Sequence, residues 1–166
     1  MLIYVIFECF CFLKTSSILK KEVLFLIIQF ILFSCYFIDI HILSYSFAPW
    51  VNYTLLSLVG LGFVVIFLGI LNLNDDLSGI HSKKGSRMTF NGIYQYVRHP
   101  IYSGILLSML AYALFTASVL KVVLTVIMAV VFYYKSDSEE SWMVEKYEQY
   151  RVYKKKTGRF FPKLRK

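Results

Sequence analysis

The chain has 166 residues, of which 58% are hydrophobic and 17% are charged, whereas a soluble domain is usually about 45–50% apolar. Because the apolar residues gather in long runs, this composition argues against an ordinary soluble domain and predicts an all-α integral membrane protein. The net charge of +8 resides in the connections and in the C-terminal tail. That pattern indicates membrane topology and contact with anionic lipid rather than with nucleic acid.

Five apolar runs predict about five transmembrane helices. A helix of thirteen residues would reach only about 20 Å, short of the bilayer core of about 30 Å. The first run is therefore expected to be a short span, a span trimmed at its start or a signal-like anchor. The last two runs are joined by a short turn at residues 116–118, which predicts an antiparallel helical hairpin. The runs are residues 1–13, 23–38, 53–71, 100–117 and 119–134.

The distribution of Lys and Arg predicts the orientation of these spans. Residues 72–99 and 135–166 hold most of the basic side chains and residues 14–21 hold three Lys, whereas residues 39–52 hold none. By the positive-inside rule, the first three segments lie in the cytoplasm and the last lies outside. The sequence therefore predicts a multi-pass protein whose polar chemistry faces the cytoplasm, and it leaves the oligomeric state open.

Two regions differ in composition, and they divide the chain near residue 72. Residues 1–71 are predicted to be N-terminal transmembrane helices. Residues 72–166 are predicted to be the catalytic region, formed by the cytoplasmic loop, the hairpin and the tail.

The tail carries the signals of a second kind of helix. Ser136 and Glu139 fit the S-x-x-E capping pattern, which predicts a helix that begins there and runs to roughly Lys154. Gly158 and Pro162 then end it. Such a helix would be amphipathic and interfacial, with one face formed by Met143, Tyr147 and Tyr150.

Neither the glycines nor the cysteines predict a separate site. Gly60, Gly62 and Gly69 lie in an apolar run without the strand–turn–helix context of a nucleotide loop, so we interpret them as small residues for close helix packing. The three cysteines lie in apolar runs and are expected to pack as small hydrophobes. His99 has no His or Cys at ligand spacing, so no metal site is predicted.

Residues 92–104, with the sequence GIYQYVRHPIYSG, concentrate aromatic and basic side chains at the start of the hairpin. One interpretation is structural: Pro100 starts a helix, Arg98 marks the cytoplasmic face, and the tyrosines are interfacial. A hairpin also returns the chain to the same membrane face, so this motif should meet Lys135 and the acidic pair Glu139-Glu140. A mixed pocket of that kind suits a zwitterionic or amphiphilic ligand. Its predicted walls are Tyr94, Arg98, His99 and Tyr102 on one side and Lys135, Glu139 and Glu140 on the other.

The pattern G-x-Y-x-Y-x-R-H-P-x-Y-x-G, followed by two crossings and E-E, resembles the isoprenylcysteine carboxyl methyltransferase family. That family is part of a wider group that includes phospholipid methyltransferases. The resemblance covers about residues 86–162 and implies S-adenosylmethionine as cofactor. It implies cofactor contacts at Tyr94, His99, Pro100, Ile101, Tyr102, Gly104, Glu139 and Glu140, and along the stretch Ser86, Arg87, Met88 and Thr89.

The resemblance implies methyl transfer to an amphiphilic or membrane-borne acceptor by in-line displacement. Arg98 or Lys135 would hold an anionic acceptor, and these two are the candidate catalytic residues. The most favoured reaction is carboxyl methylation of a prenylcysteine-like acceptor, and methylation of a phospholipid amine or a small thiol is the next alternative. Two alternatives remain open: an NADPH-dependent membrane reductase of the sterol type, which carries a similar hairpin motif, and a non-catalytic membrane scaffold.

Overall fold

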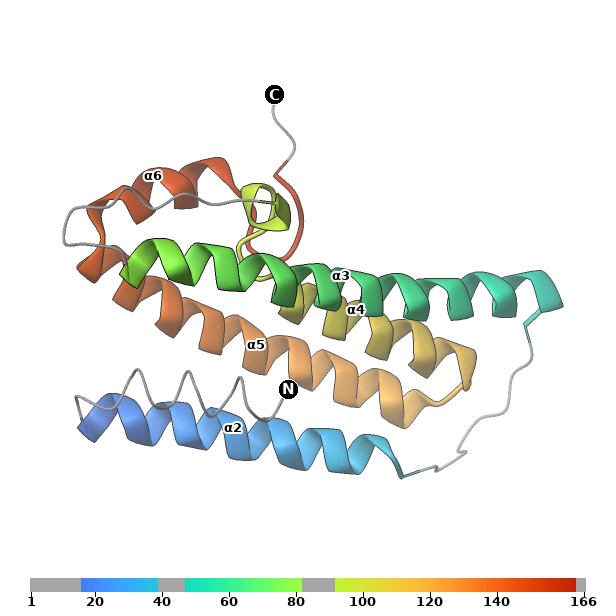
Figure 1. Cartoon of the computed structure of the whole chain (residues 1–166). Coiled ribbons are helices and arrows are strands. Elements are labelled where there is room, and N and C mark those ends of the chain that lie inside the picture. Colours follow the sequence, from blue (N-terminus) through green and yellow to red (C-terminus); the bar gives the residue numbers. More distant parts are fainter. Residues whose placement is uncertain (1–15, 39–46, 82–91, 164–166) are drawn as a thin grey trace. The chain divides into compact units, whose positions relative to one another are not determined.

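The computed structural model describes residues 16–38, 47–81 and 92–163, and these residues are helical or irregular. The all-α class is confirmed for this part of the chain (Figure 1). The predicted first span, residues 1–13, lies outside the described residues. The helices are α2 (Ser16–Tyr36), α3 (Pro49–His81), α4 (Pro100–Phe115), α5 (Val119–Lys146) and α6 (Glu148–Lys156), with a 3₁₀ turn η1 (Gly92–Gln95) before α4.

The chain divides into two compact units, residues 1–39 and 40–166. Helix α2 is the described part of the first unit, and it begins earlier than the predicted span at residue 23. All the other helices, and every candidate site residue that the structure describes, belong to the second unit.

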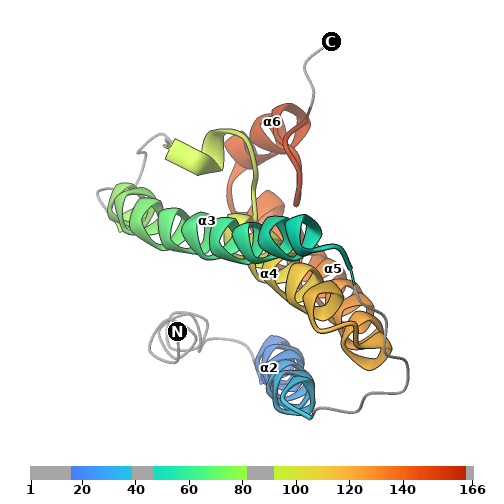
Figure 2. The ribbon, with the colours of Figure 1, turned by 90° about the vertical axis from the view of Figure 1, so that its right-hand side faces the viewer.

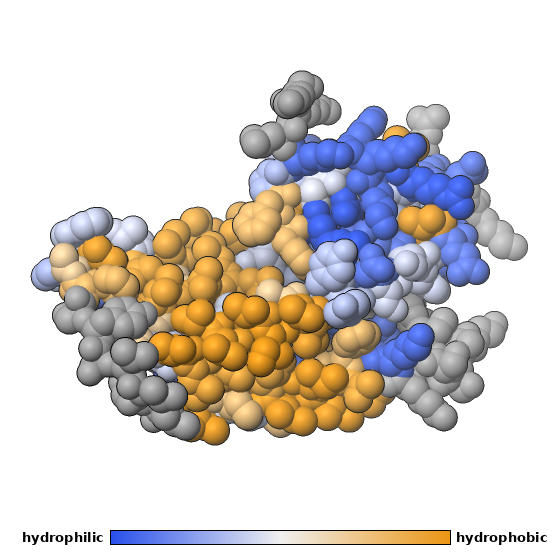
Figure 3. Space-filling view, turned by 180° about the vertical axis from the view of Figure 1, so that it is seen from behind, coloured by the Kyte–Doolittle hydropathy of each residue, from blue (hydrophilic) through white to orange (hydrophobic). Residues whose placement is uncertain are grey.

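Among the described residues, two helical stretches are long and apolar enough to cross a membrane, Pro49–Asn72 and Val119–Lys146. Helix α4 is apolar but shorter. Two of the five predicted crossings therefore have a candidate helix, and the other three remain predictions. Apolar side chains cover a broad surface of the molecule, whereas hydrophilic side chains gather at the end that carries α6 (Figure 3).

Helix α3 packs against α4 through a contact between glycines. A β-carbon on Gly62 would lie 2.7 Å from the carbonyl oxygen of Gly104, and one on Gly104 would lie 2.6 Å from the carbonyl oxygen of Gly62. A β-carbon on Gly69 would lie 2.8 Å from the side chain of Ile101. Small-residue packing is thus confirmed for Gly62 and Gly69, but Gly60 has open space around it and takes no part.

The predicted hairpin of α4 and α5 is confirmed, and the two helices lie side by side (Figure 1, Figure 2). Ala117 adopts a left-handed conformation with φ 51°. The amide of Ser118 donates to the carbonyl of Ala113 at 3.1 Å, and the amide of Ala117 donates to Leu114 at 3.1 Å. These are the two bonds of a Schellman turn. Ser118 then caps α5 by accepting from the amide of Lys121.

The predicted helix start at Ser136 is wrong. Helix α5 runs unbroken through this residue, and the hydroxyl of Ser136 donates to the carbonyl of Tyr133 within the helix. The break comes later, at Tyr147, which has an extended backbone. The predicted tail face of Met143, Tyr147 and Tyr150 is therefore not one helical face, because the break at Tyr147 separates Met143 from Tyr150. The helix start was misplaced because the S-x-x-E pattern is equally compatible with a helix interior.

The predicted loop after Leu71 is also partly wrong, since α3 continues to His81. The change from apolar to polar residues at Asn72 marks where hydrocarbon contact would end. It does not stop the helix, because the backbone hydrogen bonds of a helix are made within the helix, whether the side chains face lipid or water.

We expect Gly104→Ala to lower the free energy of unfolding by about 1–3 kcal/mol, because the added methyl overpacks the contact with Gly62. The matched control is Gly60→Ala, which adds the same methyl to open space in α3 and should leave stability unchanged or slightly raised. Thermal unfolding in detergent micelles, followed by circular dichroism, measures the difference. Equal melting temperatures for the two variants would contradict the packing role of Gly104.

Candidate functional site

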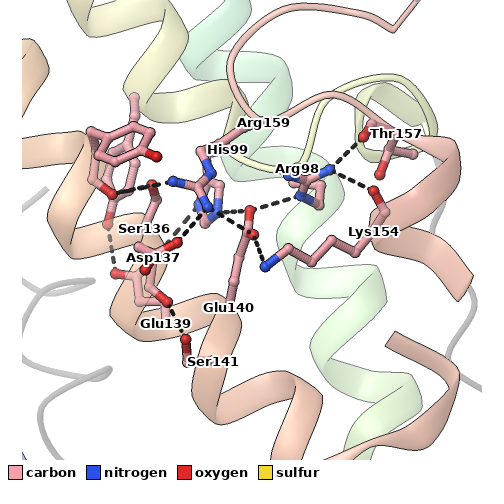
Figure 4. A network of polar contacts seen from close by, with 12 residues as sticks. Arg98, His99, Ser136, Asp137, Glu139, Glu140, Ser141, Lys154, Thr157 and Arg159 are labelled. Atoms are coloured by element: carbon pink, nitrogen blue, oxygen red, sulfur yellow. Dashed lines mark hydrogen bonds and ion pairs between the residues drawn. The ribbon is translucent and has the colours of Figure 1, made fainter. Parts of the chain in front are cut away.

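The start of α4, the end of α5 and the tail meet in one polar cluster (Figure 4). The hydroxyl of Tyr102 donates to Oε1 of Glu139 at 2.8 Å, and Nε of Arg98 donates to Oε1 of Glu140 at 2.7 Å. The predicted meeting of the motif with the acidic pair is therefore confirmed. The hairpin brings together residues that lie about forty positions apart in the sequence.

The carboxylate of Glu140 is the centre of this cluster, and its side chain has 0% exposure. Its Oε1 atom faces Arg98 and also Nε2 of His99 at 3.3 Å. Its Oε2 atom lies 2.9 Å from Nζ of Lys154 and 3.2 Å from Nη2 of Arg159. Three cations therefore compensate one buried negative charge, which would otherwise be costly to desolvate.

Arg98 is also held by the backbone of the tail. Its Nη1 donates to the carbonyls of Lys154, at 3.1 Å, and of Thr157. The guanidinium thus links the motif to Glu140 on α5 and to the end of α6. Its predicted role, contact with an anionic acceptor, stays a prediction.

Glu139 has a different environment from its neighbour, because its side chain is 22% exposed. Besides Tyr102, it faces Nδ1 of His99 at 3.6 Å and Nζ of Lys135 at 3.8 Å. The Lys135 ammonium also lies over the ring of Tyr102, 5.5 Å from its centroid. Tyr102 in turn stacks on Phe132 at 4.5 Å. This arrangement is a partly exposed carboxylate with a cation and stacked rings beside it.

The imidazole of His99 lies between the two carboxylates and stacks on Tyr102 at 5.4 Å. Burial is the main reason that the pKa of His99 is held below its ordinary value of 6.5. Glu140 opposes this shift of the pKa, whereas the charges of Arg98 and Arg159 reinforce it. The lowered pKa favours the neutral imidazole, which has one N–H donor and one ring nitrogen acceptor.

A tail segment, residues 157–161, covers the motif from the side of α6. It pairs with the backbone before α4: the amide of Arg98 donates to Gly158 at 2.9 Å, the amide of Gly158 donates to Tyr96 at 3.2 Å, and the amide of His99 donates to Arg159 at 3.1 Å. The hydroxyl of Ser103 donates to the carbonyl of Phe160 at 2.7 Å. The tail segment is thus part of the site.

Other predicted residues have structural contacts. Pro100 starts α4, as predicted, and is buried. Ile101 and Gly104 face α3. Tyr94 is buried in η1, and its carbonyl accepts from the hydroxyl of Tyr153 at 2.6 Å. Their predicted cofactor contacts stay predictions, and the predicted stretch Ser86, Arg87, Met88 and Thr89 lies outside the described residues.

Four residues of the cluster are not among those that the sequence predicts for the site: Asp137, Lys154, Arg159 and Phe160. Arg159 donates to Oδ1 of Asp137 at 2.7 Å as well as to Glu140. Arg159 and Phe160 lie in a short run of basic and aromatic residues after Gly158, which is the local signal for these two. Such a run does not reveal its partners, because they lie on another helix.

We expect Glu140→Ala to lower the free energy of unfolding by about 3–5 kcal/mol, because it leaves Arg98 buried without its carboxylate. Glu145→Ala is the matched control, since Glu145 is an exposed glutamate near the end of the same helix. Chemical unfolding in detergent compares the two variants with the unmodified protein. A Glu140 variant as stable as the control would contradict the central place of this carboxylate.

A family model described as phospholipid methyltransferase matches residues 51–150. The matched region contains most of α3, the whole hairpin and the acidic pair, and it ends before the tail segment. Neither the curated proteins nor the solved structures contain a match to the chain. Because the family model covers more than half of the 166 residues, the chain belongs to the phospholipid methyltransferase family of membrane methyltransferases, which includes the isoprenylcysteine carboxyl methyltransferase-like proteins.

Proposed function

We propose that the protein is a multi-pass membrane methyltransferase that uses S-adenosylmethionine and acts on an amphiphilic or membrane-borne acceptor. The observation that carries this proposal is the partly exposed Glu139, held beside Tyr102 and Lys135 at the polar end of an apolar hairpin. Membership of a methyltransferase family supports methyl transfer over the sterol-type reductase.

The side chains around Glu139 fit the chemistry of this cofactor, which combines an ammonium, a carboxylate, ribose hydroxyls, a sulfonium and an adenine ring. The Glu139 carboxylate can accept hydrogen bonds from an ammonium or from hydroxyls. The stacked rings of His99, Tyr102 and Phe132 suit a cation or a planar base.

The bound cofactor would supply an electrophilic methyl group on its sulfonium. The task of the protein is then to position the acceptor, since a near-attack arrangement can lower a barrier by several kcal/mol. A carboxylate acceptor is ionised at neutral pH and needs no base. Lys135 offers it a cation, so a prenylcysteine-like carboxylate is our first candidate acceptor.

A phospholipid amine is the second candidate, and the description of the matched family favours it. An amine must lose a proton before it can attack, because its ordinary pKa is near that of Lys. Neutral His99 is the base candidate within the motif, although its nitrogens face Glu139 and Glu140 in this structure.

The surface of the molecule supports separate entry for the two reactants. Exposed apolar side chains extend along α5 to Tyr133 and Tyr134, close to the polar cluster, so a lipid-like acceptor can approach from the bilayer. The polar cofactor would approach from the hydrophilic end near α6 (Figure 3). The basic residues of the tail favour a cytoplasmic position for that end by the positive-inside rule.

We expect Glu139→Gln to weaken the binding of S-adenosylhomocysteine at least tenfold, because a hydrogen bond to a charged group contributes about 1.5–3 kcal/mol. Glu145→Gln, which removes an exposed charge from the same helix, should bind as the unmodified protein does. Isothermal titration calorimetry on the protein in nanodiscs measures both. Binding of NADPH in place of S-adenosylhomocysteine would support the reductase, and binding of neither would support the scaffold.

The acceptor is tested with methyl-labelled S-adenosylmethionine and three acceptors: a prenylcysteine carboxylate, phosphatidylethanolamine and a small thiol. We expect the most label in the methyl ester. Lys135→Gln should raise the KM for the carboxylate more than for the amine, because it removes a cation that pairs only with an anion. Preferential labelling of phosphatidylethanolamine, unaffected by Lys135→Gln, would overturn the carboxylate assignment.

A further inference from the structure

Arg159 is placed along one face of α5, although it lies in the tail segment. Its guanidinium lies over the ring of Tyr133, 4.7 Å from the centroid, and its Nη2 donates to Asp137 at 2.7 Å and to Glu140 at 3.2 Å. These three partners are four and three residues apart, so they form a single stripe on the helix. The side chain of Arg159 is 17% exposed and joins two turns of α5 to the tail.

The backbone of the same residue holds the start of α4. The carbonyl of Arg159 accepts from the amide of His99 at 3.1 Å. On either side, Gly158 accepts from the amide of Arg98, and Phe160 accepts from the hydroxyl of Ser103. The ring of Phe160 lies 6.2 Å from the imidazole of His99. Arg159 therefore links the motif before α4 to helix α5.

Arg159 contacts only one of the two adjacent glutamates, and their environments differ. Glu140 is directed toward Arg159 and Lys154 and has no exposed surface, whereas Glu139 is directed toward Tyr102 and keeps some exposure. Adjacent residues on a helix point in directions about 100° apart. Arg159 and Lys154 both lie on Oε2 of Glu140 and hold this carboxylate on the side away from Tyr102.

We propose that Arg159 is a positioning residue for the cofactor site: by bridging Asp137 and Glu140 and holding the backbone of His99, it leaves Glu139 as the carboxylate presented to the ligand. This inference rests on the proposed function, and it extends the site beyond residue 150, where the family match ends.

The role requires arginine rather than any cation. The guanidinium makes these contacts with two nitrogens, Nη2 toward Asp137 and Glu140 and Nη1 toward the carbonyl of Tyr133 at 3.5 Å, while its delocalised charge lies over the Tyr133 ring. An ammonium has a single nitrogen and a localised charge. Asp137 is half-exposed, and its carboxylate keeps the guanidinium of Arg159 in position beside Glu140.

The test compares Arg159→Gln, Arg159→Lys and Asp137→Asn with the control Arg151→Gln, an exposed basic residue of α6. Full-length protein in nanodiscs is titrated with S-adenosylhomocysteine, and thermal unfolding is measured in parallel. We expect at least tenfold weaker binding for Arg159→Gln, a loss of several-fold for Arg159→Lys and Asp137→Asn, and no change for the control. Unchanged affinity in the folded Arg159 variants, with only a lower melting temperature, would reduce Arg159 to a structural role and overturn the inference.

A second measurement follows the titration of His99 by NMR of labelled histidine, with His99→Gln used to assign the signal. Because the Arg159 charge helps to hold the pKa of His99 low, its removal should move the midpoint to higher pH, and Arg151→Gln should not. The groups that face this imidazole are Arg98 from its own loop, Tyr102 from α4, Glu139 and Glu140 from α5, and Arg159 and Phe160 from the tail.

The two measurements separate the possible failures. If the unmodified protein does not bind S-adenosylhomocysteine, the proposed function fails, and the His99 titration still decides whether Arg159 orders the cluster. If the unmodified protein binds and Arg159→Gln binds equally tightly, the proposed function stands and the inference about Arg159 fails. An unmoved His99 midpoint in Arg159→Gln would also overturn it.

Discussion

The carboxylate of Glu140 is fully removed from solvent, and a buried charge persists only where opposite charges and hydrogen bonds replace water. Here its partners come from three separate segments: Arg98 and His99 before α4, Lys154 in α6, and Arg159 in the tail segment. A single side chain of α5 therefore holds three other parts of the chain in place. The environments of the other site residues depend on this arrangement, because His99 and Glu139 are neighbours of the same cluster.

The glycine contact between α3 and α4 supports this cluster from the apolar side. Where Gly62 and Gly104 meet, the backbones approach more closely than any side chain would allow. Small residues serve this purpose where lipid surrounds helices, since burial of apolar surface no longer drives association. The contact orients α4 against α3, and the hairpin then presents the start of α4 to the end of α5.

The two adjacent glutamates have different environments. Glu140 stabilises the interior of the cluster, and Glu139 faces a partly exposed region with Lys135 and stacked aromatic rings. A ligand with both positive and negative groups matches that second environment. The membership of the chain in a methyltransferase family and this environment point to the same class of chemistry, and the tail segment adds Arg159 to the residues that shape it.

The sequence by itself determined the apolar helices, the hairpin and the meeting of the Arg98-His99 motif with the acidic pair. Run length predicts a membrane crossing, and a hairpin of two helices returns the chain to the end at which it began. Only the tertiary structure decided that α5 continues past Ser136, that Glu140 rather than Glu139 is buried, and that Arg159 joins the site. Capping patterns are local and also occur inside helices, and contacts between residues 20 to 60 positions apart depend on how the helices pack. For that reason, the partners of the tail segment could not be read from its own residues.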